Sequence, residues 1–345
     1  LGKTTSTKGN HDITWEQTYE YNAGIDFSAL DNRISLTLEG YYSITKQLLF
    51  KQPVVSFMGY SDYWNNIGRI RNSGIEIELN THNIRTKNFE WTTSFNLSSN
   101  FNKLLELSGE ERLISTGERN ETYLAQVGHR AISFFGYKTD GVYLNQADLD
   151  ASPHLASATP GSLKIVDIND DGVINDKDRT VIGNPNPSWL FSMNNSLSYK
   201  GFELSVFLQG IAGNKIYNAN NIDNTGMAAA YNQTTDVLKR WQGEGTSNSM
   251  PRAVFGDPNQ NTRVSDRFVE NGSYLRLKNI TLSYTFPKQW LQKAQIENAR
   301  LSLSCENVAT ITGYSGFDPE VGINGIDQNR YPISRTFSLG LNFNF

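Results

Sequence analysis

The sequence predicts an all-β fold in which about nine antiparallel strands form part of a β-barrel that spans a membrane. Three observations predict this fold. Apolar and polar side chains alternate along several long segments, the connections between those segments are short and long in turn, and aromatic side chains gather near the segment ends. Together these features are typical of a transmembrane antiparallel β-barrel.

The composition limits the classes of protein to which this chain can belong. Its 345 residues suffice for one large domain or two smaller ones. The net charge of −4 gives no sign of a basic surface, which argues against nucleic-acid binding. The single cysteine, Cys305, excludes an internal disulfide bond and a cysteine-based metal cluster. The mean hydropathy of −0.48 does not exclude barrel strands, because only alternate residues of such strands face lipid.

The alternation of side chains is clearest in two neighbouring segments, residues 189–199 and 202–209. The apolar face of the first segment carries Trp189, Phe191, Met193, Leu197 and Tyr199. Serine and asparagine dominate its other face. Only Lys200 and Gly201 separate the two segments, which predicts a tight hairpin.

The same pattern recurs in seven other segments. They are residues 15–28, 34–48, 73–81, 89–101, 275–286, 299–308 and 337–345. Many of them are long enough to cross a bilayer, which takes ~9–11 residues at the usual tilt. Alternation alone fits a soluble β-sandwich equally well, because each sheet of a sandwich also has one apolar and one polar face.

The lengths of the connections separate these two folds. Long connections cover residues 49–72, 102–188, 210–272 and 309–335, and short ones cover 29–33, 82–88, 200–201 and 287–298. The two kinds alternate strictly along the chain. Short turns at one end and long extracellular loops at the other are the plan of an outer-membrane barrel. Insertions in a sandwich have no reason to keep this parity, so the sequence favours the barrel.

Aromatic side chains fit the same fold. Those near predicted strand ends are Tyr19, Tyr21, Tyr41, Tyr42, Tyr199, Tyr284 and Phe286. Barrels carry girdles of such residues at the membrane interfaces, although an ordinary β core would explain each one equally well. The last residue, Phe345, ends the apolar face of the final segment. It resembles the terminal aromatic residue that marks bacterial outer-membrane proteins for barrel assembly.

Residues 167–178, DINDDGVINDKD, have the spacing of an EF-hand calcium loop. The predicted ligands are Asp167, Asn169, Asp171, the backbone carbonyl of Val173, Asn175 and Asp178. Asp178 stands where the usual loop has a glutamate, which indicates a looser or smaller coordination shell. Because no helix pair flanks the loop, we expect a structural calcium ion or similar hard cation rather than a sensor. An Asx-rich turn that holds only water is the alternative.

Segments along most of the chain resemble one protein family. They are WEQTYEYNAGIDFSALDNRISLTLEGYY (15–42), NIGRIRNSGIEIEL (66–79), GYKTDGVY (136–143), IGNPNPSWLFSMNNSLSYKGFELSVFLQGIAGNKIYN (182–218), GSYLRLKNITLSYTFP (272–287) and ENVATITGYSGFDPEV (306–321). In this order they are similar to the SusC/RagA branch of the TonB-dependent transporters, which is found in the outer membranes of Bacteroidetes.

The resemblance implies a barrel of roughly 22 strands around an N-terminal plug, of which this chain would supply about the last nine. Residues 1–345 would be the C-terminal part of one barrel domain, and residues 102–188 a long extracellular loop that carries the 167–178 motif. The plug and the first half of the barrel would lie outside this chain. A companion segment is expected, because open sheet edges are unstable in lipid.

The resemblance also implies a function and partners. It implies active import of a large nutrient across the bacterial outer membrane, with an oligosaccharide as the expected cargo and a peptide as the alternative. The implied partners are a SusD-like surface lipoprotein that acts as a lid, TonB acting through the plug, membrane lipid and the cargo. A secreted, calcium-stabilised glycan-binding module or adhesin is the alternative from a different class. Such a module would need neither the parity of the connections nor the terminal Phe345.

Five aromatic residues in the predicted long loops are candidates for contacts with cargo or lid, since flat rings suit sugar faces and protein partners alike. They are Tyr60, Tyr63, Trp64, Trp241 and Tyr314. Packing of the loops on one another would explain each of them as well. Glu76 and Glu78 are interpreted as polar residues that line the lumen rather than as a catalytic pair. No catalytic triad, phosphate-binding loop or zinc spacing occurs, so enzymatic activity is not expected.

Overall fold

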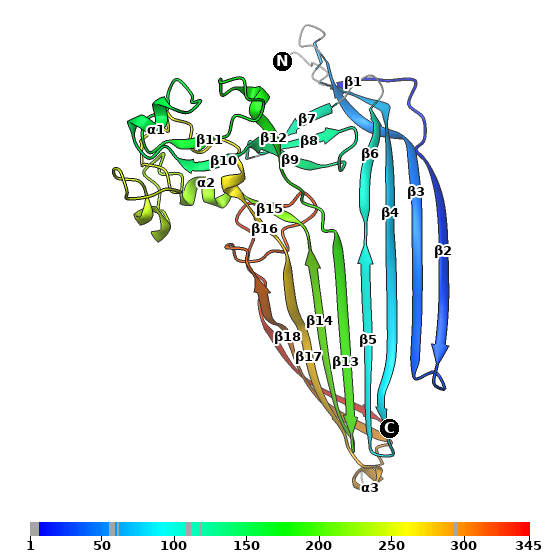
Figure 1. The fold of residues 1–345 in the computed structure, drawn as a ribbon. Helices are drawn as coiled ribbons and strands as arrows, with labels where there is room; N and C mark the ends of the chain where they lie inside the picture. The colour runs from blue at the N-terminus through cyan, green and yellow to red at the C-terminus, as the bar shows by residue number, and fades with distance from the viewer. Residues whose placement is uncertain (1–6, 55–58, 61, 108–111, 118, 293–294) are drawn as a thin grey trace, which may run out of the picture.

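The computed structural model describes residues 7–54, 59–60, 62–107, 112–117, 119–292 and 295–345. Its main feature is a curved antiparallel sheet whose strands follow one another in the order β2-β3-β4-β5-β13-β14-β17-β18-β20 (Figure 1). These nine strands confirm the strand number and the antiparallel pairing that the sequence predicts. In the described part of the chain, none of the helices has the length and apolar character needed to cross a membrane.

The strands of this wall are long. Their bounds are β2 (Gln17–Ala29), β3 (Ile34–Pro53), β4 (Asp62–Arg85), β5 (Phe89–Ser99), β13 (Trp189–Tyr199), β14 (Phe202–Ala212), β17 (Tyr274–Thr285), β18 (Asn298–Thr312) and β20 (Thr336–Asn344). Two shorter strands also pair with β4: β1 (Thr7–Lys8) runs parallel to it, and β6 (Phe101–Leu107) continues β5 along it.

The connections alternate between the two ends of the wall, as the sequence predicts. The four short turns lie together at the end of the wall near the C-terminus, and the long connections lie at the opposite end (Figure 1). Between β13 and β14, Lys200 has φ of 46° and Gly201 has φ of 89°. Both residues are in the left-handed region, as a two-residue type I′ hairpin turn requires. Between β17 and β18, the short turn carries the helix α3 (Lys288–Leu291).

One predicted long loop is mostly strand. The connection expected over residues 49–72 is reduced to residues 54–61, because β3 extends to Pro53 and β4 begins at Asp62. The register shifts between Lys46 and Leu48, where Gln47 has a left-handed φ of 58°. Such a bulge inserts one extra residue, so the side chains beyond it switch to the opposite faces of the sheet. The alternation in the sequence therefore breaks at the bulge, while the hydrogen-bonded pairing of β3 with β4 continues.

The other long connections fold into a compact region, here called the loop domain, formed by the described residues of 112–188, 213–273 and 313–335 (Figure 1). Its strands are β7 (Arg112–Thr116), β8 (Thr122–Gln126), β9 (Ser133–Tyr137), β10 (Thr139–Val142), β11 (Leu163–Ile165), β12 (Arg179–Gly183), β15 (Lys215–Asn218), β16 (Val269–Asn271) and β19 (Ile326–Asp327). Its helices are α1 (Gln146–Asp150), η2 (Asp176–Asp178), α2 (Asn220–Asn224), η3 (Thr235–Lys239) and η4 (Asp266–Phe268). Of the stretch 102–188, predicted as one loop, residues 102–107 thus belong to β6 of the wall, and the described residues from 112 onward belong to the loop domain.

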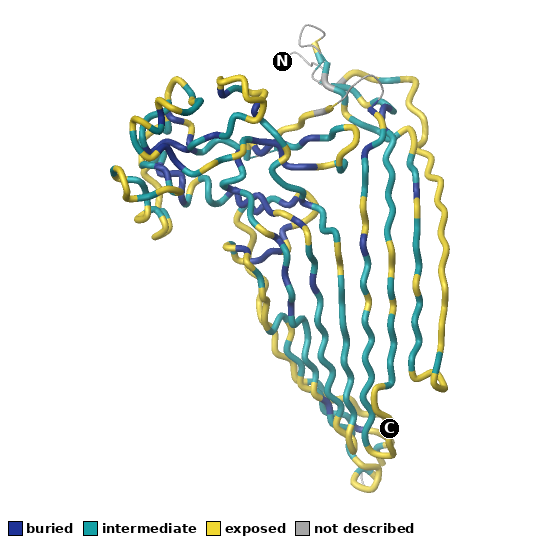
Figure 2. The backbone as a smooth tube through the Cα atoms, viewed as in Figure 1, coloured by how far each residue is buried: buried dark blue, intermediate teal, exposed yellow. Residues whose placement is uncertain are grey.

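The buried core lies in the loop domain rather than in the wall (Figure 2). Phe134, Tyr217 and Phe268 are fully buried there, and they come from two different connections. The wall instead exposes its apolar face. On β20, for example, Phe337 and Leu339 are 71% and 72% exposed. A sheet with one exposed apolar face matches the lipid-facing band of a transmembrane barrel.

We predict that Gly201→Ala destabilises the β13–β14 hairpin by about 1 kcal/mol, since φ at this position is strained for any residue with a Cβ. An added Cβ would also lie 2.9 Å from the carbonyl oxygen of Thr285. The temperature at which the full-length protein loses its compact, heat-modifiable migration in SDS gels measures the effect. Gly40→Ala is the matched control, because a Cβ there meets no atom within 4 Å. An equal shift in both variants would contradict the prediction.

Candidate functional site

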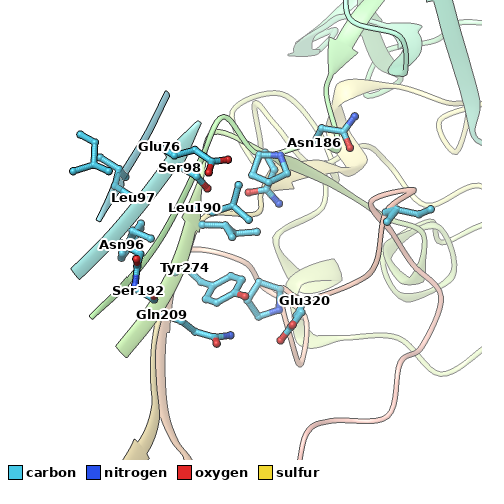
Figure 3. A pocket seen from close by; sticks show the side chains of 18 of the residues that line it. Glu76, Asn96, Leu97, Ser98, Asn186, Leu190, Ser192, Gln209, Tyr274 and Glu320 are labelled. Carbon is cyan, nitrogen blue, oxygen red and sulfur yellow. The ribbon is translucent and has the colours of Figure 1, made fainter. Parts of the chain in front are cut away.

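A cavity of about 780 Å³ lies between the polar face of the wall and two segments of the loop domain (Figure 3). We call it the lumen cavity. Its floor is formed by β3, β4, β5, β13, β14 and β17. Its roof is formed by residues 185–187 and by residues 319–325. The cavity thus joins strands and loops that are far apart in the sequence.

The strand pairing gathers polar side chains on the floor of the lumen cavity. Glu39 of β3 stands opposite Glu76 of β4, and Glu78 stands opposite Asn96 of β5. Period-two alternation directs all four side chains to the same face of the sheet. Ser98, Ser192 and Gln209 continue this polar surface across the next strands (Figure 3). The placement of Glu76 and Glu78 agrees with their interpretation as residues that line the lumen.

The lumen cavity is acidic. Its charged lining residues are Glu39, Glu76, Glu78 and Glu320, and none of the described residues that line it is Lys, Arg or His. Carboxylates, amides and hydroxyls all accept hydrogen bonds, so this surface suits a ligand with many donors, such as a neutral polyhydroxylated molecule. It disfavours an anionic ligand, because like charges repel at close range.

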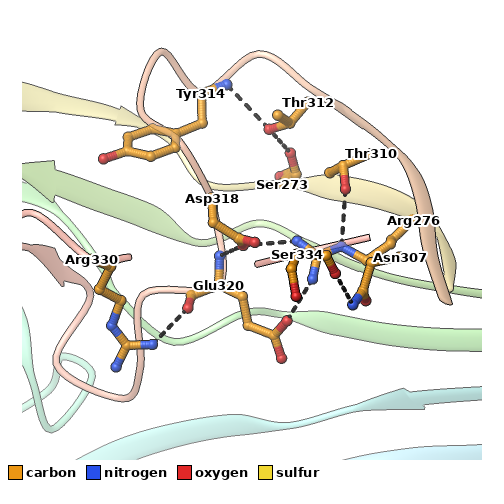
Figure 4. A network of polar contacts seen from close by, with 10 residues as sticks. All are labelled: Ser273, Arg276, Asn307, Thr310, Thr312, Tyr314, Asp318, Glu320, Arg330 and Ser334. Carbon is orange, nitrogen blue, oxygen red and sulfur yellow. Dashed lines mark hydrogen bonds and ion pairs between the residues drawn. The ribbon is translucent and has the colours of Figure 1, made fainter. Parts of the chain in front are cut away.

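A buried ion pair attaches the roof to the floor. The guanidinium of Arg276 on β17 donates to Asp318 Oδ1 at 2.7 Å and to Glu320 Oε2 at 2.9 Å (Figure 4). Its Nε donates to Thr310 Oγ1 on β18 at 3.0 Å. Arg276 is only 1% exposed, so its charge depends on these partners for compensation.

Backbone contacts fix the shape of the same roof segment. The N–H of Glu320 donates to Asp318 Oδ1 at 2.8 Å, and Arg330 Nη1 donates to the carbonyl oxygen of Glu320 at 2.9 Å. At Gly325, where φ is 65°, an added Cβ would overlap Pro185 of the other roof segment. The two segments therefore pack on each other as well as on the wall.

Tyr314 is not the exposed aromatic residue that the sequence predicts. It is only 6% exposed and packs with Ile216 and Val321. Its hydroxyl donates to Asp327 Oδ2 at 2.6 Å. Burial, and then the hydrogen bond to Asp327, raises the pKa of Tyr314. Its ring joins two loop segments, so it offers no face to a ligand.

The other aromatic candidates also lie outside the lumen cavity. Trp241 is partly buried against Gly161 and donates from Nε1 to the carbonyl oxygen of Leu144 at 3.1 Å. It packs the loop domain together. Tyr63 and Trp64 lie in β4 rather than in a loop, because the β3–β4 ladder extends past the predicted strand ends.

At the end of the β3–β4 ladder, the Tyr63 hydroxyl donates to Gln52 Oε1 at 2.9 Å. Trp64 is 44% exposed, and Lys51 Nζ lies 5.6 Å from its ring centroid. Tyr60 is partly exposed in the β3–β4 connection. Phe345 lies one residue beyond β20 and is 87% exposed.

The 167–178 loop closes through its own side chains. Both carboxylate oxygens of Asp178, which is fully buried, accept backbone N–H groups, from Ile168 at 3.0 Å and from Asn175 at 2.7 Å. Asp167 Oδ2 accepts from the N–H of Gly172 at 2.8 Å, whereas its Oδ1 is buried without a hydrogen-bond partner. Among the described residues, no three His, Cys, Asp or Glu side chains converge as a ready-made metal site.

Comparison with known proteins identifies the family. A family model described as "TonB dependent receptor-like, beta-barrel" matches residues 1–308. This chain belongs to that family. The TonB-dependent receptor P3 of Formosa agariphila is 33% identical over 97% of this chain, which covers 35% of that protein. The TonB-dependent receptor SusC of Bacteroides thetaiotaomicron is 31% identical over 97% of this chain, which covers 32% of that protein.

A solved structure shows the same fold. The structure titled "Structure of the RagAB peptide transporter" superposes with a TM-score of 0.83 at 24% identity, over all of this chain and 37% of that chain. The receptor chain thus spans about a third of the length of the relatives it matches.

These findings confirm several predictions for the receptor chain. They confirm the resemblance to SusC and RagA, the partial barrel fold and the location in the outer membrane. The family consists of transport receptors, which confirms that the chain is not an enzyme.

The sequence analysis missed the residues that build the roof. Arg276 and Asp318 are 42 positions apart, and no local pattern links them. The pairing of Glu39 with Glu76 leaves a weaker signal: their strands, β3 and β4, are consecutive in the sequence, and consecutive strands often pair. The bulge at Gln47 lies farther along the β3–β4 ladder and does not disturb that pairing.

We predict that Arg276→Gln releases residues 313–335 from the wall, since removing one partner of a buried ion pair costs about 3–5 kcal/mol. Hydrogen–deuterium exchange of the full-length receptor should show faster exchange across this segment. Arg300→Gln is the matched control, because the Arg300–Glu203 pair is 42% and 41% exposed and should contribute little. Unchanged exchange at 313–335 in Arg276→Gln would contradict the assigned role.

Proposed function

We propose that the complete protein imports an oligosaccharide across the outer membrane, and that the lumen cavity forms part of the passage. The observation that carries this proposal is the cavity itself, which lies on the polar face of a barrel wall under a roof of folded loops. Its carboxylate, amide and hydroxyl lining can accept hydrogen bonds from sugar hydroxyls. Its acidic character favours a neutral cargo over an acidic one.

A peptide is the alternative cargo. The structure with the same fold is titled a peptide transporter, although at 24% identity the likeness extends to the fold alone. A peptide also carries N–H donors that the acidic lining would accept. A neutral or basic peptide would therefore suit the cavity better than an acidic one.

We further propose that residues 1–345 form the C-terminal part of one barrel domain, which other segments of the protein complete. In the described sheet, β2 and β20 are the two edges of the wall, and each pairs with one neighbour in the strand order. An open edge leaves backbone groups unpaired in lipid, which is strongly unfavourable. Further strands and a plug that couples to TonB complete the proposed importer. In it, the loop domain of this chain faces outward.

A SusD-like surface lipoprotein is the proposed lid over the loop domain. Several aromatic side chains of this domain are largely exposed, among them Tyr231 at 67%, Phe255 at 83% and Tyr331 at 91%. Exposed aromatic rings are the residues that protein interfaces favour. Tyr60, Tyr63 and Trp64, at the same end of the wall, keep their proposed role in contacts with lid or cargo.

Uptake by living cells tests the import proposal. Cells that carry the full-length gene should accumulate a labelled neutral oligosaccharide, and the gene deletion should abolish this accumulation. Dissipating the proton motive force should stop uptake in the same cells, because TonB-dependent transport draws its energy from the inner membrane.

Fractionation of the same cells tests whether the protein is a membrane transporter or a secreted module. The protein should stay with the outer membrane until detergent is added. Recovery in the soluble extracellular fraction would instead support a secreted glycan-binding module or adhesin. Uptake of a neutral peptide but of no oligosaccharide would support the alternative cargo.

We also propose that the 167–178 loop binds calcium or a similar hard cation that braces the loop domain. The residue types fit, because Asp167, Asn169, Asp171, Asn175 and Asp178, with the carbonyl of Val173, offer only oxygen ligands. The buried, unpartnered Oδ1 of Asp167 supports the proposal, since a cation would compensate it. An Asx-rich turn without an ion remains the competing interpretation.

We predict that calcium protects this loop against proteolysis and that chelation exposes it. Replacing Asp167 and Asp171 together with Ala should abolish the calcium-dependent difference, because two of the oxygen ligands are lost. Limited proteolysis of the full-length receptor with and without chelator measures the effect. The pair Asp148→Ala and Asp150→Ala, in helix α1 outside the motif, is the control. Identical cleavage of the unmodified receptor in calcium and in chelator would contradict the proposal.

A further inference from the structure

A second cavity, of about 520 Å³, lies within the loop domain and shares no lining residue with the lumen cavity. It is lined by α2, by η3 and by residues 315–317. Five of its lining residues are asparagines, at positions 218, 220, 221, 224 and 329, and we call it the asparagine pocket. Its volume is within the range of about 300–1,000 Å³ that is common for ligand sites.

The asparagine pocket contains a hydrogen-bond acceptor without a donor. Asn218 is 2% exposed, and its Nδ2 donates to Glu270 Oε1 at 2.9 Å and to Ser315 Oγ at 3.3 Å. Because a carboxylate can only accept, this contact fixes which side of the amide carries nitrogen. The remaining atom, Asn218 Oδ1, is buried and has no hydrogen-bond partner. Leaving such an atom unpaired is costly, so a donor from a ligand would be stabilising.

The same pocket is lined by a guanidinium that makes no direct ion pair with any described residue, although Asp257 lies near enough to act on its charge. Arg267 Nη2 donates to the carbonyl oxygen of Thr225 at 2.9 Å, and Nη1 donates to that of Asn261 at 3.3 Å. Among the described residues, none offers Arg267 a carboxylate within ion-pair distance, and its Nε has no hydrogen-bond partner. Burial lowers the pKa of Arg267 to about 10, so the group stays protonated at neutral pH. Arg267 therefore lines the pocket with N–H donors that are not all used by described protein groups.

A hydroxyl group satisfies both requirements with a single oxygen atom. It donates to an acceptor such as Asn218 Oδ1 and accepts from a donor such as Arg267, whereas a carboxylate can only accept and an ammonium can only donate. The other asparagine amides of the pocket also offer both donors and acceptors. Phe317 lines the pocket with 76% of its surface exposed, so its ring face is open to stacking on a sugar.

We propose that the asparagine pocket binds a sugar ring of a neutral oligosaccharide, as a site separate from the lumen cavity. The inference deepens the proposed function and rests on it for the identity of the cargo. In that setting the pocket holds one end of the oligosaccharide on the loop domain, before or while another part enters the lumen.

Binding to the purified full-length receptor in detergent tests this inference. The probes are neutral glucose and mannose hexasaccharides, a glucuronate hexasaccharide and a neutral hexapeptide, each measured by saturation-transfer NMR and calorimetry. We expect at least one neutral hexasaccharide to bind, and Phe317→Ala to weaken that binding about tenfold through loss of ring stacking. Asn224→Ala, which removes an amide from the pocket lining, should also weaken it.

Phe255→Ala is the matched control, because Phe255 is also an exposed aromatic residue, at 83%, but lies outside the pocket. It should leave affinity unchanged. The inference is overturned if neither neutral hexasaccharide binds, if both pocket variants bind as the unmodified receptor does, or if the glucuronate or the peptide binds more tightly. Uptake by cells separates this result from the import proposal. If cells import the oligosaccharide but Phe317→Ala does not change its binding, the pocket assignment is rejected and the import proposal stands. If the oligosaccharide binds at the pocket but cells do not import it, the import proposal is rejected and the pocket assignment stands.

Discussion

The structure of this receptor chain depends on the pairing of backbone groups across the strands of its wall. In a bilayer no water can pair with N–H and C=O groups, so each strand must be satisfied by its neighbours. Strand β13 illustrates the result, since all its residues from Trp189 to Tyr199 pair without a shift with β5 on one side and β14 on the other. The bulges in other strands change which side chains face the lumen without opening the ladder.

A wall of this kind has consequences for where the protein can bury apolar side chains. One face of the sheet meets lipid and the other meets the lumen, so the wall itself builds no packed core. The core lies instead in the loop domain, where Phe134, Tyr217 and Phe268 are fully buried. The loop domain is held to the wall by the buried Arg276 and its two carboxylate partners. The shape of the lumen cavity follows from this attachment, because Glu320 and its neighbours form the roof.

The two cavities have complementary chemistry. The lumen cavity presents carboxylates and amides on the regular surface of a sheet. The asparagine pocket presents amides, the guanidinium of Arg267 and the ion pair of Asp236 with Lys239 among irregular loops. Both sets of groups can pair with hydroxyls. Only the lumen cavity has an excess of negative charge, with four carboxylates among its lining residues.

The sequence by itself determined the wall: the nine strands, their antiparallel order and the two ends of the barrel. Those features depend on residues close together in the sequence. They follow from period-two alternation and from turns such as Lys200–Gly201, where two adjacent residues determine the hairpin. Only the tertiary structure decided the extent of β3 and β4, because the bulge at Gln47 interrupts the alternation but not the ladder. It also decided that Tyr314 and Trp241 pack loops together and that Arg276 joins Asp318 across 42 positions. Contacts between distant loop residues produce no periodic pattern in the sequence, because they depend on how three separate connections fold against one another.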